Sequence, residues 1–427
     1  MNLPSNGENT VYLQPRPLAL SSGKLLLLPL LPRRRTTPIS ANGDHSSCNP
    51  RVALLLVCKT LKEVALPLFY SSVRITLLAS LQDFTDLLVA ADRKWDSIRR
   101  IPYSAPGRWV HALDLSDLQI GIGDEAPQAD VVLTRLFPLL PFLQTLTLNS
   151  AVPLSRSVWE SLSDRDGGHN LRVLSGVKIC SSPHNIDVEE SFVELLQRCH
   201  YLEELNIVGS GLEGIELAAT VDGRPGEDPH ARYSGLKIPH MPHLRKFSAI
   251  SMHASAVMCS LLLSPLPSLI HLTLTPYDDI SIPTSLVPSF IDAHGPKVYS
   301  LHLYAHKSWP TMLFPSPTTI LHTCTRLHHL SLENPLPVLT ICSIYPRYPL
   351  RVLSIPRPNP DFLGVLESLL PKLPNLRVVR TRDVRWLRRG MSDRALEAGV
   401  QGEMREWRRR LGRRGIRVLD ADWTPGD

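Results

Sequence analysis

Paired cysteines and aromatic residues are scarce in this chain of 427 residues. Its seven cysteines are scattered singly, with no CxxC pair, which argues against a zinc ribbon or a disulfide framework. Asn-x-Ser/Thr glycosylation acceptors are also absent, as is usual for a reducing compartment. Aromatic residues make up only 6% of the chain, so leucine must supply most of the core. A leucine-rich core broken by 38 prolines predicts many short elements rather than a compact enzyme fold.

Apolar runs long enough to cross a membrane are missing as well. The longest one near the N-terminus is Leu25–Leu31, which Pro29 interrupts, whereas a span needs about 20 residues. It follows a leader rich in Pro and Ser, which does not resemble a signal peptide. We therefore expect a protein of the cytoplasm and/or nucleus with no membrane partner.

Motifs for catalysis and cofactor binding are missing too. The chain has no GxSxG, GxxxxGK[ST] or GxGxxG motif, and Gly121-Ile122-Gly123 lacks the third glycine. Met241-Pro242 separates His240 from His243 and breaks any helix that would align them. His328-His329 has no Cys or carboxylate at ligand spacing. We expect a protein that is not an enzyme, with no catalytic residue, metal site or cofactor.

One phrase recurs along the chain: an apolar residue, two variable residues, Leu, one variable residue and another apolar residue. Ten copies begin between residues 110 and 376, at a mean spacing of roughly 30 residues, and Ile416-Leu419-Ala421 forms a last copy. The clearest copies are Leu143-Leu146-Leu148, Leu202-Leu205-Ile207, Leu269-Leu272-Leu274, Leu327-Leu330-Leu332 and Leu350-Leu353-Ile355. The weaker ones are Val110-Leu113-Leu115, Leu171-Leu174-Gly176, Leu244-Phe247-Ala249, Val298-Leu301-Leu303 and Leu376-Val379-Thr381.

Prolines and helical patterns between these copies indicate strand–helix units. Pro141, Pro242, Pro267, Pro296 and Pro374 each stand two residues before the first apolar position, where proline ends a helix and favours extended backbone. Apolar residues then recur every three to four positions, as in 192–199 and 362–370. A repeated strand and helix predicts an α/β leucine-rich-repeat solenoid, with strands on its inner face and helices outside.

The alternation of side chains along a strand fixes which residues would face inward. The position between the second and third apolar residues is mostly small and hydroxylated, which would let a partner's backbone approach closely. Larger groups flank this column, with acidic residues early and arginine late. The candidate residues for binding an unidentified protein substrate are Asn206, His271, Thr273, His302, Tyr304, His329, Arg380 and Arg382.

Residues 51–75 follow a different pattern, with apolar residues on one helical face and charged residues on the other. The string Leu54-Leu55-Leu56-Val57-Cys58-Lys59, followed by Val64-Ala65-Leu66-Pro67-Leu68-Phe69-Tyr70, resembles the second half of an F-box. Val73-Arg74-Ile75 suits the first solenoid strand. With its repeats, the chain resembles fungal-type F-box and leucine-rich-repeat proteins. The opening Leu-Pro-x-Glu-Leu-Leu segment of an F-box has at best a remnant in Leu25–Leu31, so the F-box is degenerate or truncated.

The resemblance implies the substrate-recognition subunit of an SCF-type cullin-RING ubiquitin ligase. A Skp-type adaptor would be its partner, and catalysis would belong to other subunits. The adaptor-binding residues it implies are Leu54, Val57, Cys58, Leu61, Leu68 and Phe69. In the alternative interpretation, 51–70 is an N-terminal cap of a solenoid scaffold that has no connection to a ligase.

The C-terminal segment is strongly basic. Between Arg377 and Arg417 fourteen arginines face five acidic residues, a net charge of +9, and the remainder of the +6 chain therefore carries −3. Apolar residues form one stripe here, with Ser392 as a helix N-cap and Gly412 as a helix stop: Leu396, Val400, Met404, Trp407 and Leu411. This pattern favours a terminal cap over a nucleic-acid surface, which is the third and weakest functional hypothesis.

Four segments follow from these patterns. We predict a disordered leader over 1–50, a partial F-box-like helical segment over 51–76 and a solenoid over 77–390. The solenoid would extrude a loop at 219–236, where Gly, Pro and charged residues gather. An arginine-rich helix and strand would cap it over 391–427.

Overall fold

The computed structural model describes residues 18–20, 57–95, 105–121, 125–180, 186–209, 237–252, 255–275, 285–305, 316–341, 347–386 and 400–425. Within these ranges one 13-stranded sheet runs through the molecule, and its strands follow one another in sequence order. All pairings between these strands are parallel. The strands are β1 Leu18–Leu20, β2 Ser72–Ile75, β3 Ala112–Asp114, β4 Thr145–Thr147, β5 Val173–Ile179, β6 Glu204–Gly209, β7 Lys246–Ile250, β8 His271–Leu274, β9 Ser300–Leu303, β10 His329–Ser331, β11 Val352–Ile355, β12 Val378–Thr381 and β13 Arg417–Leu419.

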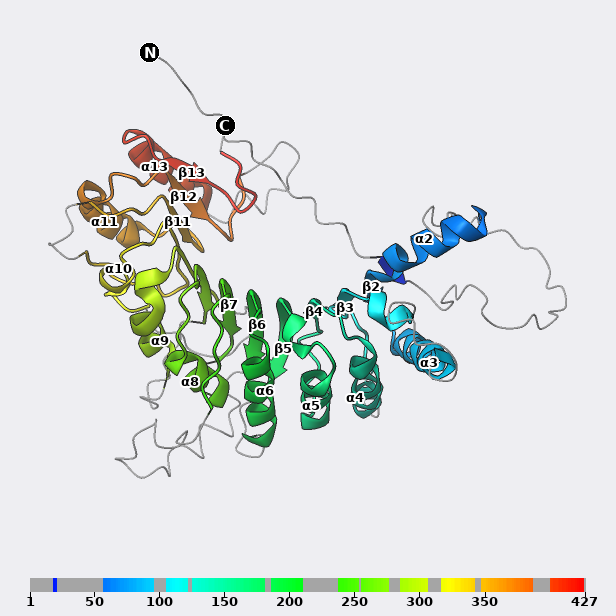
Figure 1. The fold of residues 1–427 in the computed structure, drawn as a ribbon. Coiled ribbons are helices and arrows are strands. Elements are labelled where there is room, and N and C mark those ends of the chain that lie inside the picture. Colours follow the sequence, from blue (N-terminus) through cyan, green and yellow to red (C-terminus); the bar gives the residue numbers. More distant parts are fainter. Residues whose placement is uncertain are drawn as a thin grey trace, which may run out of the picture.

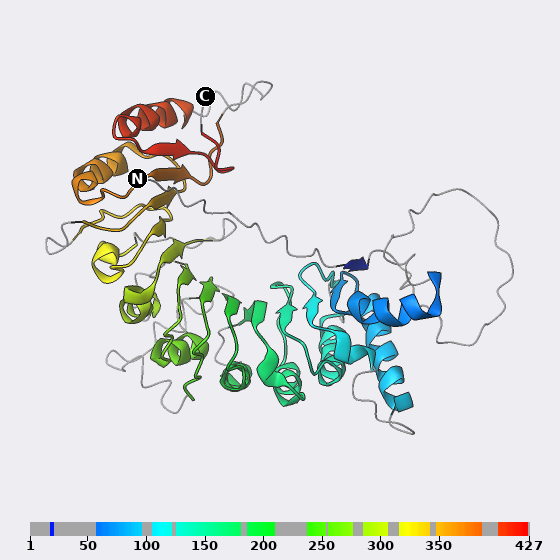
Figure 2. The ribbon, with the colours of Figure 1, turned by 45° about the horizontal axis from the view of Figure 1, so that its top comes forward.

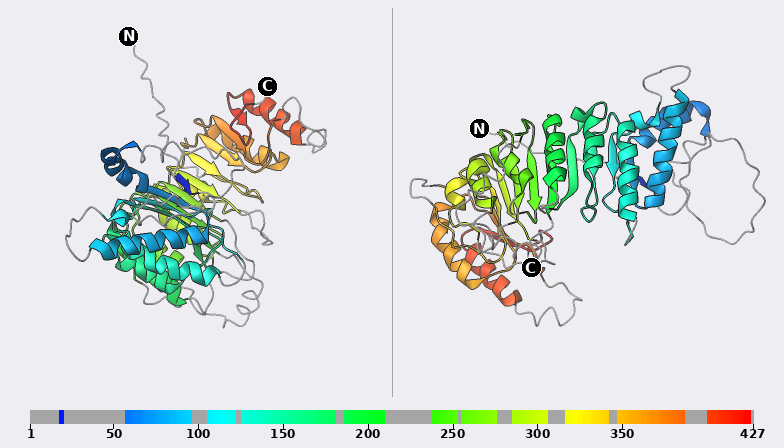
Figure 3. Two further views of the ribbon diagram at one scale, coloured as in Figure 1. Left: turned by 90° about the vertical axis from the view of Figure 1, so that its right-hand side faces the viewer. Right: turned by 90° about the horizontal axis from the view of Figure 1, so that it is seen from below.

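Helices lie between most successive strands in the described ranges and, apart from α2, cover one side of the sheet. They are α2 Lys59–Tyr70, α3 Leu78–Trp95, α4 Glu125–Leu136, α5 Arg156–Asp164, α6 Ile186–Arg198, α8 Ala256–Leu263, α9 Val287–His294, α10 Ile320–Thr323, α11 Pro360–Leu369 and α13 Val400–Gly412. Figures 1 and 2 show an arc with the strands on its inner side and the helices on its outer side. Seen from below, the outer helices lie next to one another along the arc (Figure 3). The expected α/β architecture of repeated strand–helix units is confirmed.

The recurring phrase places its apolar residues in the core, as expected. Its second apolar position is almost completely buried in every copy from Leu113 to Val379, with at most 1% of the side chain exposed. Pairing aligns these residues on adjacent strands, for example Leu272 with Leu301 and Leu330 with Leu353. Burying one such side chain contributes about 1.5–3 kcal/mol. No single unit can cover its own apolar side, so each repeat is stabilised by its neighbours.

The prolines and the predicted helical segments also lie where the sequence places them. Each of the five prolines sits in a turn or a short 3-10 helix shortly before a strand, and all but Pro242 also follow a described helix. Residues 192–198 fall on α6 and Cys199 follows it directly, and Phe192, Leu195, Leu196 and Cys199 are all fully buried. Residues 362–370 fall on α11 and the 3-10 turn that follows it.

Two copies of the phrase are shifted by one residue. In β5, the register against β6 slips between Leu174 and Val177. Val177, rather than Gly176, therefore takes the third apolar position, and it is fully buried. In β13, Val418 instead of Leu419 pairs with Val379 in the core column. Leu419 pairs with Arg380 on the inner face, so the predicted copy Ile416-Leu419-Ala421 was wrong by one residue.

The two ends of the array complete the sheet. Of the expected leader, the structure describes only Leu18–Leu20, which form β1 beside β2. At the other end α13 buries Met404, Trp407 and Leu411 and ends at Gly412, as predicted for the cap. The loop expected at 219–236, together with Ser392 and Leu396, lies outside the described residues.

Candidate functional site

The inner face carries an aligned column of side chains. From β6 to β12 the register places Asn206, Ser248, Thr273, His302, Ser331, Ser354 and Arg380 on successive strands. This is the column that strand alternation predicts, and neighbouring members lie about 4.8 Å apart. The column is therefore a continuous strip along the inside of the arc.

Over the early strands this face is charge-compensated. The Nε of Arg74 on β2 lies 3.5 Å from a carboxylate oxygen of Asp114 on β3, and Arg74 also pairs with Asp117. On β6 and β7 the ammonium of Lys246 lies 2.6 Å from a carboxylate oxygen of Glu204. Such exposed cross-strand pairs contribute little binding potential, because each charge already has its partner.

Over the late strands the inner face carries an aromatic and cationic cluster, which we call the inner cluster and define as His302, His329, Arg380, Arg382 and Trp423. The rings of His302 and His329 meet edge to face, 4.5 Å apart. The guanidinium of Arg380 lies 4.4 Å from the centre of the Trp423 ring, within the range of a cation–π interaction. Trp423 also meets His329 edge to face at 6.5 Å.

Burial keeps the two histidines of the inner cluster neutral. Loss of hydration, followed by charge repulsion from Arg382, His271 and Arg380, lowers the pKa of His302 to about 4. For His329, burial and, after it, charge repulsion from His302 and Arg380 likewise lower the pKa to about 4. Nε2 of His302 shares a hydrogen bond of 2.9 Å with Ser300 Oγ, and Nε2 of His329 shares one of 3.1 Å with Ser354 Oγ. At neutral pH the positive charge of the cluster therefore belongs to its arginines.

The two arginines are held differently. Arg382 donates to the carbonyl of Leu332 at 2.6 Å and forms a salt bridge of 3.0 Å with Glu333. Arg380 donates to the carbonyl of Ala421 at 2.6 Å, and its other contact is with Trp423. Within the part of the chain that the structure describes, Arg380 forms no salt bridge. Burial and Arg382 lower its pKa overall, although the carboxylates of Asp420 and Asp422 are near enough to oppose this shift.

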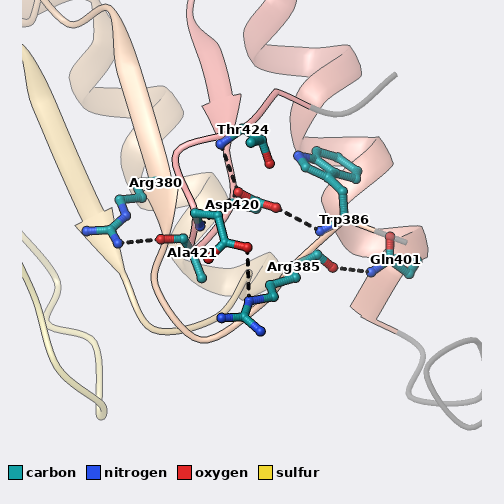
Figure 4. Close-up of polar contacts among 8 residues, drawn as sticks. Arg380, Arg385, Trp386, Gln401, Asp420, Ala421 and Thr424 are labelled. Atoms are coloured by element: carbon teal, nitrogen blue, oxygen red, sulfur yellow. Dashed lines mark hydrogen bonds and ion pairs between the residues drawn. The ribbon is translucent and has the colours of Figure 1, made fainter. Parts of the chain in front are cut away.

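A buried carboxylate fixes the segment that carries Trp423. Asp420 is fully buried and accepts hydrogen bonds from the backbone N–H groups of Trp386, Asp422 and Thr424, at 3.1, 3.0 and 2.9 Å (Figure 4). Burial raises the pKa of Asp420, but these hydrogen bonds outweigh it and the pKa is lowered overall. The anchored turn holds Trp423 at a φ of 61°, which is rare for a residue other than glycine. Such strain is found where the surrounding structure imposes a conformation.

The structure brings together some of the predicted residues and separates others. His302, His329, Arg380 and Arg382 meet in the inner cluster, and His271 is near enough to affect the pKa of both histidines. Thr273 lies next to His302 in the register of β8 and β9, Asn206 lies three strands earlier on the same face, and Tyr304 follows β9. Trp423 was missed, because it follows the last repeat and belongs to no periodic pattern.

The hydroxyl column is not open along its whole length. Ser331 and Ser354 are only 1% and 0% exposed, so the expectation that a partner's backbone could approach them was wrong. The histidine side chains of the inner cluster lie over this stretch, and His329 bonds directly to Ser354. A partner here would meet rings and guanidinium groups instead of small hydroxyls.

A second candidate surface lies at the opposite end, on α2. No residue of α2 is buried, and an apolar stripe with helical spacing runs along it: Leu61 is half-buried, and Val64 and Leu68 are 65% and 72% exposed. Val57, 67% exposed, precedes the extended N-cap residue Cys58 and lies just before the helix. The other side of α2 packs on the array, where Tyr70 contacts the rings of Phe84 and Trp109. Figure 1 shows the helix projecting from the arc.

The implied adaptor residues divide between these two sides of α2. Leu61 and Leu68 lie on the stripe and Val57 lies just before the helix, while Phe69 is half-buried against Tyr70, with ring centres 5.8 Å apart. Exposed Cys58 is the N-cap of the helix, and its sulfur accepts the N–H of Leu61 at 3.4 Å. Leu54 lies outside the described residues.

Other kinds of site are not evident in the described ranges. No group of three or more His, Cys, Asp or Glu side chains could hold a metal ion there. None of the helices described has both the length and the apolar character that a membrane crossing requires.

No family model matches the sequence, and neither does any curated protein. Among solved structures, the chain is similar to a Bacteroides fragilis protein whose crystal structure was determined by a structural genomics consortium. The identity is 10% and the TM-score 0.30, over 86% of this chain and 78% of the other. A likeness at this level carries no conclusion about fold or function.

Proposed function

We propose that the chain is a leucine-rich-repeat protein that acts as the substrate-recognition subunit of an SCF-type cullin-RING ubiquitin ligase. The observation that carries the proposal is α2, a helix that leaves an apolar stripe in solvent at one end of the array. An exposed stripe at spacings of three and four residues is typical of a helix that docks on a partner protein. The sequence of this helix is the part that resembles an F-box.

The repeat array supports the recognition role. Strand–helix units of about 30 residues with leucine in the core column are typical of leucine-rich repeats. In this proposal the inner cluster holds the substrate, and Arg380 supplies a cation that forms no salt bridge among the described residues. A segment of the substrate that presents an acidic group to Arg380 and an apolar group to Trp423 would fit this chemistry. The protein itself then performs recognition, and other subunits perform catalysis.

Binding of the full chain to a purified Skp-type adaptor tests the proposal directly. We expect a complex in size-exclusion chromatography, and we expect a Val64→Asp, Leu68→Asp variant to lose it because charge cannot be buried in an apolar interface. Val131→Asp is the matched control, since Val131 is also an exposed valine on a helix, at 59% exposure, but lies on α4. Thermal unfolding of each variant verifies that the array remains folded.

The outcomes separate the proposal from the scaffold alternative. Binding that the stripe variant abolishes and the control retains supports the ligase subunit. An intact, folded chain that does not bind the adaptor overturns it. In that case 51–70 is a cap of the array, and the chain is a repeat scaffold with another partner.

A further inference from the structure

A row of residues lies where the chain enters strands β9 to β13: Tyr299, His328, Arg351, Arg377 and Arg417. Backbone hydrogen bonds join them in order, since each N–H donates to the carbonyl of the residue before it, at 2.8–2.9 Å. Neighbouring strands lie about 4.8 Å apart, so these residues form a line across one edge of the sheet. We call this line the basic row.

The basic row is accessible and carries uncompensated charge. Its three arginines are exposed, and among the residues that the structure describes they form no salt bridge. At one end Tyr299, 41% exposed, stacks on His328, with ring centres 4.0 Å apart and planes 13° apart. Exposed Arg326 and Arg414 lie in turns that lead into the same strands and add to the charge. The row is therefore cationic, with an aromatic pair at one end.

The same positions in the early repeats are arranged differently. There Arg172, Glu203 and Arg245 follow one another through the same backbone hydrogen bonds. Arg172 pairs with Glu203, its guanidinium nitrogen 3.2 Å from a carboxylate oxygen. Charges of opposite sign on adjacent strands stabilise a sheet, whereas like charges destabilise it. The late repeats thus hold like charges at a cost to folding, which an anionic partner would relieve.

We propose that the basic row is a docking surface for an acidic helix of a partner protein. On a helix, side chains three and four residues apart have Cβ atoms about 5–6 Å apart, close to the spacing of adjacent strands. Consecutive arginines can therefore each meet one carboxylate, and the planar guanidinium group binds carboxylates with two parallel hydrogen bonds. The row is separate from the inner cluster and does not depend on the proposed ligase role.

Charge spacing and ring arrangement favour a protein partner over single-stranded nucleic acid. A nucleic-acid surface interleaves basic groups with ring faces on which bases stack. Here Tyr299 and His328 stack on each other at one end of the row, and exposed arginines follow on the next three strands. The exposed side of Tyr299 suits an apolar residue at the end of the acidic helix.

The test uses the full chain and a fluorescent, alanine-based helical peptide with glutamates spaced three and four residues apart. A peptide with glutamine in place of glutamate and a single-stranded oligonucleotide of equal charge are the comparison probes. The test variant is Arg351→Gln, Arg377→Gln. The control variant is Arg245→Gln, Arg405→Gln, which removes two exposed arginines elsewhere and changes the net charge equally.

We expect the glutamate peptide to bind the chain and the control variant, and to bind the test variant about tenfold more weakly. Added salt should weaken this binding, and the glutamine peptide should not bind. The melting temperature of the test variant should be equal or higher, because a like-charge repulsion is removed. Equal losses in both variants, or no binding of the glutamate peptide, overturn the proposal. Preferential binding of the oligonucleotide that the test variant loses overturns it in favour of a nucleic-acid surface.

Discussion

The guanidinium of Arg380 lies over the ring of Trp423, 4.4 Å from its centre, and so joins the twelfth strand to the segment after the thirteenth. The two residues are 43 positions apart in the sequence, and the strands that precede them, β12 and β13, are neighbours in the sheet. The contact makes the position of the Arg380 side chain depend on the turn after β13, the closing turn, which Asp420 fixes and which carries Trp423. Three further relationships in the structure lead, with this one, to measurable expectations.

The Arg380–Trp423 contact should appear as a coupling in a double-mutant cycle. We expect Arg380→Met and Trp423→Leu to be non-additive by about 0.5–1 kcal/mol in the free energy of unfolding, which is typical of a partly exposed cation–π pair. Chemical denaturation of the two single variants and the double variant measures this coupling. Arg357→Met, which removes another exposed arginine, should be additive with Trp423→Leu. Additivity in the first cycle would contradict the contact.

The buried histidines should make stability fall as the solution is acidified from pH 6.5 toward pH 4. In the unfolded chain they gain protons near pH 6.5, whereas in the folded chain burial lowers the pKa of His302 and His329 to about 4. Below pH 6.5 the unfolded state therefore binds more protons and is favoured. The midpoint of urea unfolding at pH 7, 6 and 5 should show this slope, and His302→Gln, His329→Gln should reduce it. His240 is exposed, so His240→Gln is the control. If it reduced the pH dependence of the unfolding midpoint as much as the double variant does, the buried histidines would not be the cause.

The buried carboxylate of Asp420 should stabilise the closing turn. Asp420→Asn removes the charge that accepts three backbone N–H groups, and we expect a loss of about 1–3 kcal/mol at neutral pH. Because the folded-state pKa of Asp420 is lowered, its contribution is complete above its ordinary value near 3.8 and disappears only as the pH falls further.

Hydrogen exchange can localise that loss. The amides of Trp386 and Thr424 should exchange faster in Asp420→Asn, because both donate to this carboxylate. Asp422→Asn is the control, since the Asp422 side chain is 38% exposed and pairs with Arg385 at the surface. The Asp422→Asn variant should lose less than about 1 kcal/mol of its free energy of unfolding. Equal effects of the two variants would refute the anchoring role of Asp420.

The bulge in β5 should depend on the absence of a side chain at Gly176. Its φ is 75°, and an added Cβ would lie 2.0 Å from the carbonyl oxygen of Leu148. We expect Gly176→Ala to lower the free energy of unfolding by about 1–3 kcal/mol or more. Gly364→Ala in α11 is the control, because nothing lies within 4 Å of its added Cβ. It should be neutral or stabilising by up to about 1 kcal/mol. If the denaturation midpoint fell equally in Gly176→Ala and Gly364→Ala, the bulge would not depend on the missing side chain at Gly176.

The repeated part of the fold was predictable from the sequence because its physical cause is periodic. Leucines that must be buried at a fixed spacing, with prolines before them, identify the strands, the helices between them and the column that faces inward. His302, His329 and Arg380 were found for this reason, since each occupies a defined position of a repeat. Local alternation is enough to predict which way such side chains point.

The remaining features depend on contacts that no local pattern encodes. The ring of Trp423 reaches Arg380 through a turn fixed by Asp420, and the burial of Ser331 comes from larger side chains on neighbouring strands. The one-residue shift at Val418 is decided by pairing with Val379. Whether the α2 stripe packs inward or remains in solvent also depends on tertiary structure, because an amphipathic pattern predicts a buried face without naming its partner.

A single antiparallel bridge between Leu419 of β13 and Pro425 lies beside the last strand and bears on self-association. A parallel array ends in a strand whose free N–H and C=O groups can template the addition of another chain. Copies that stacked last strand to first would meet head to tail, and such contacts extend into open filaments. Here Leu419 of β13 forms an antiparallel bridge with Pro425, and proline has no N–H to donate onward. This return of the chain covers the edge of β13 at Leu419 and so opposes the addition of another strand at that position.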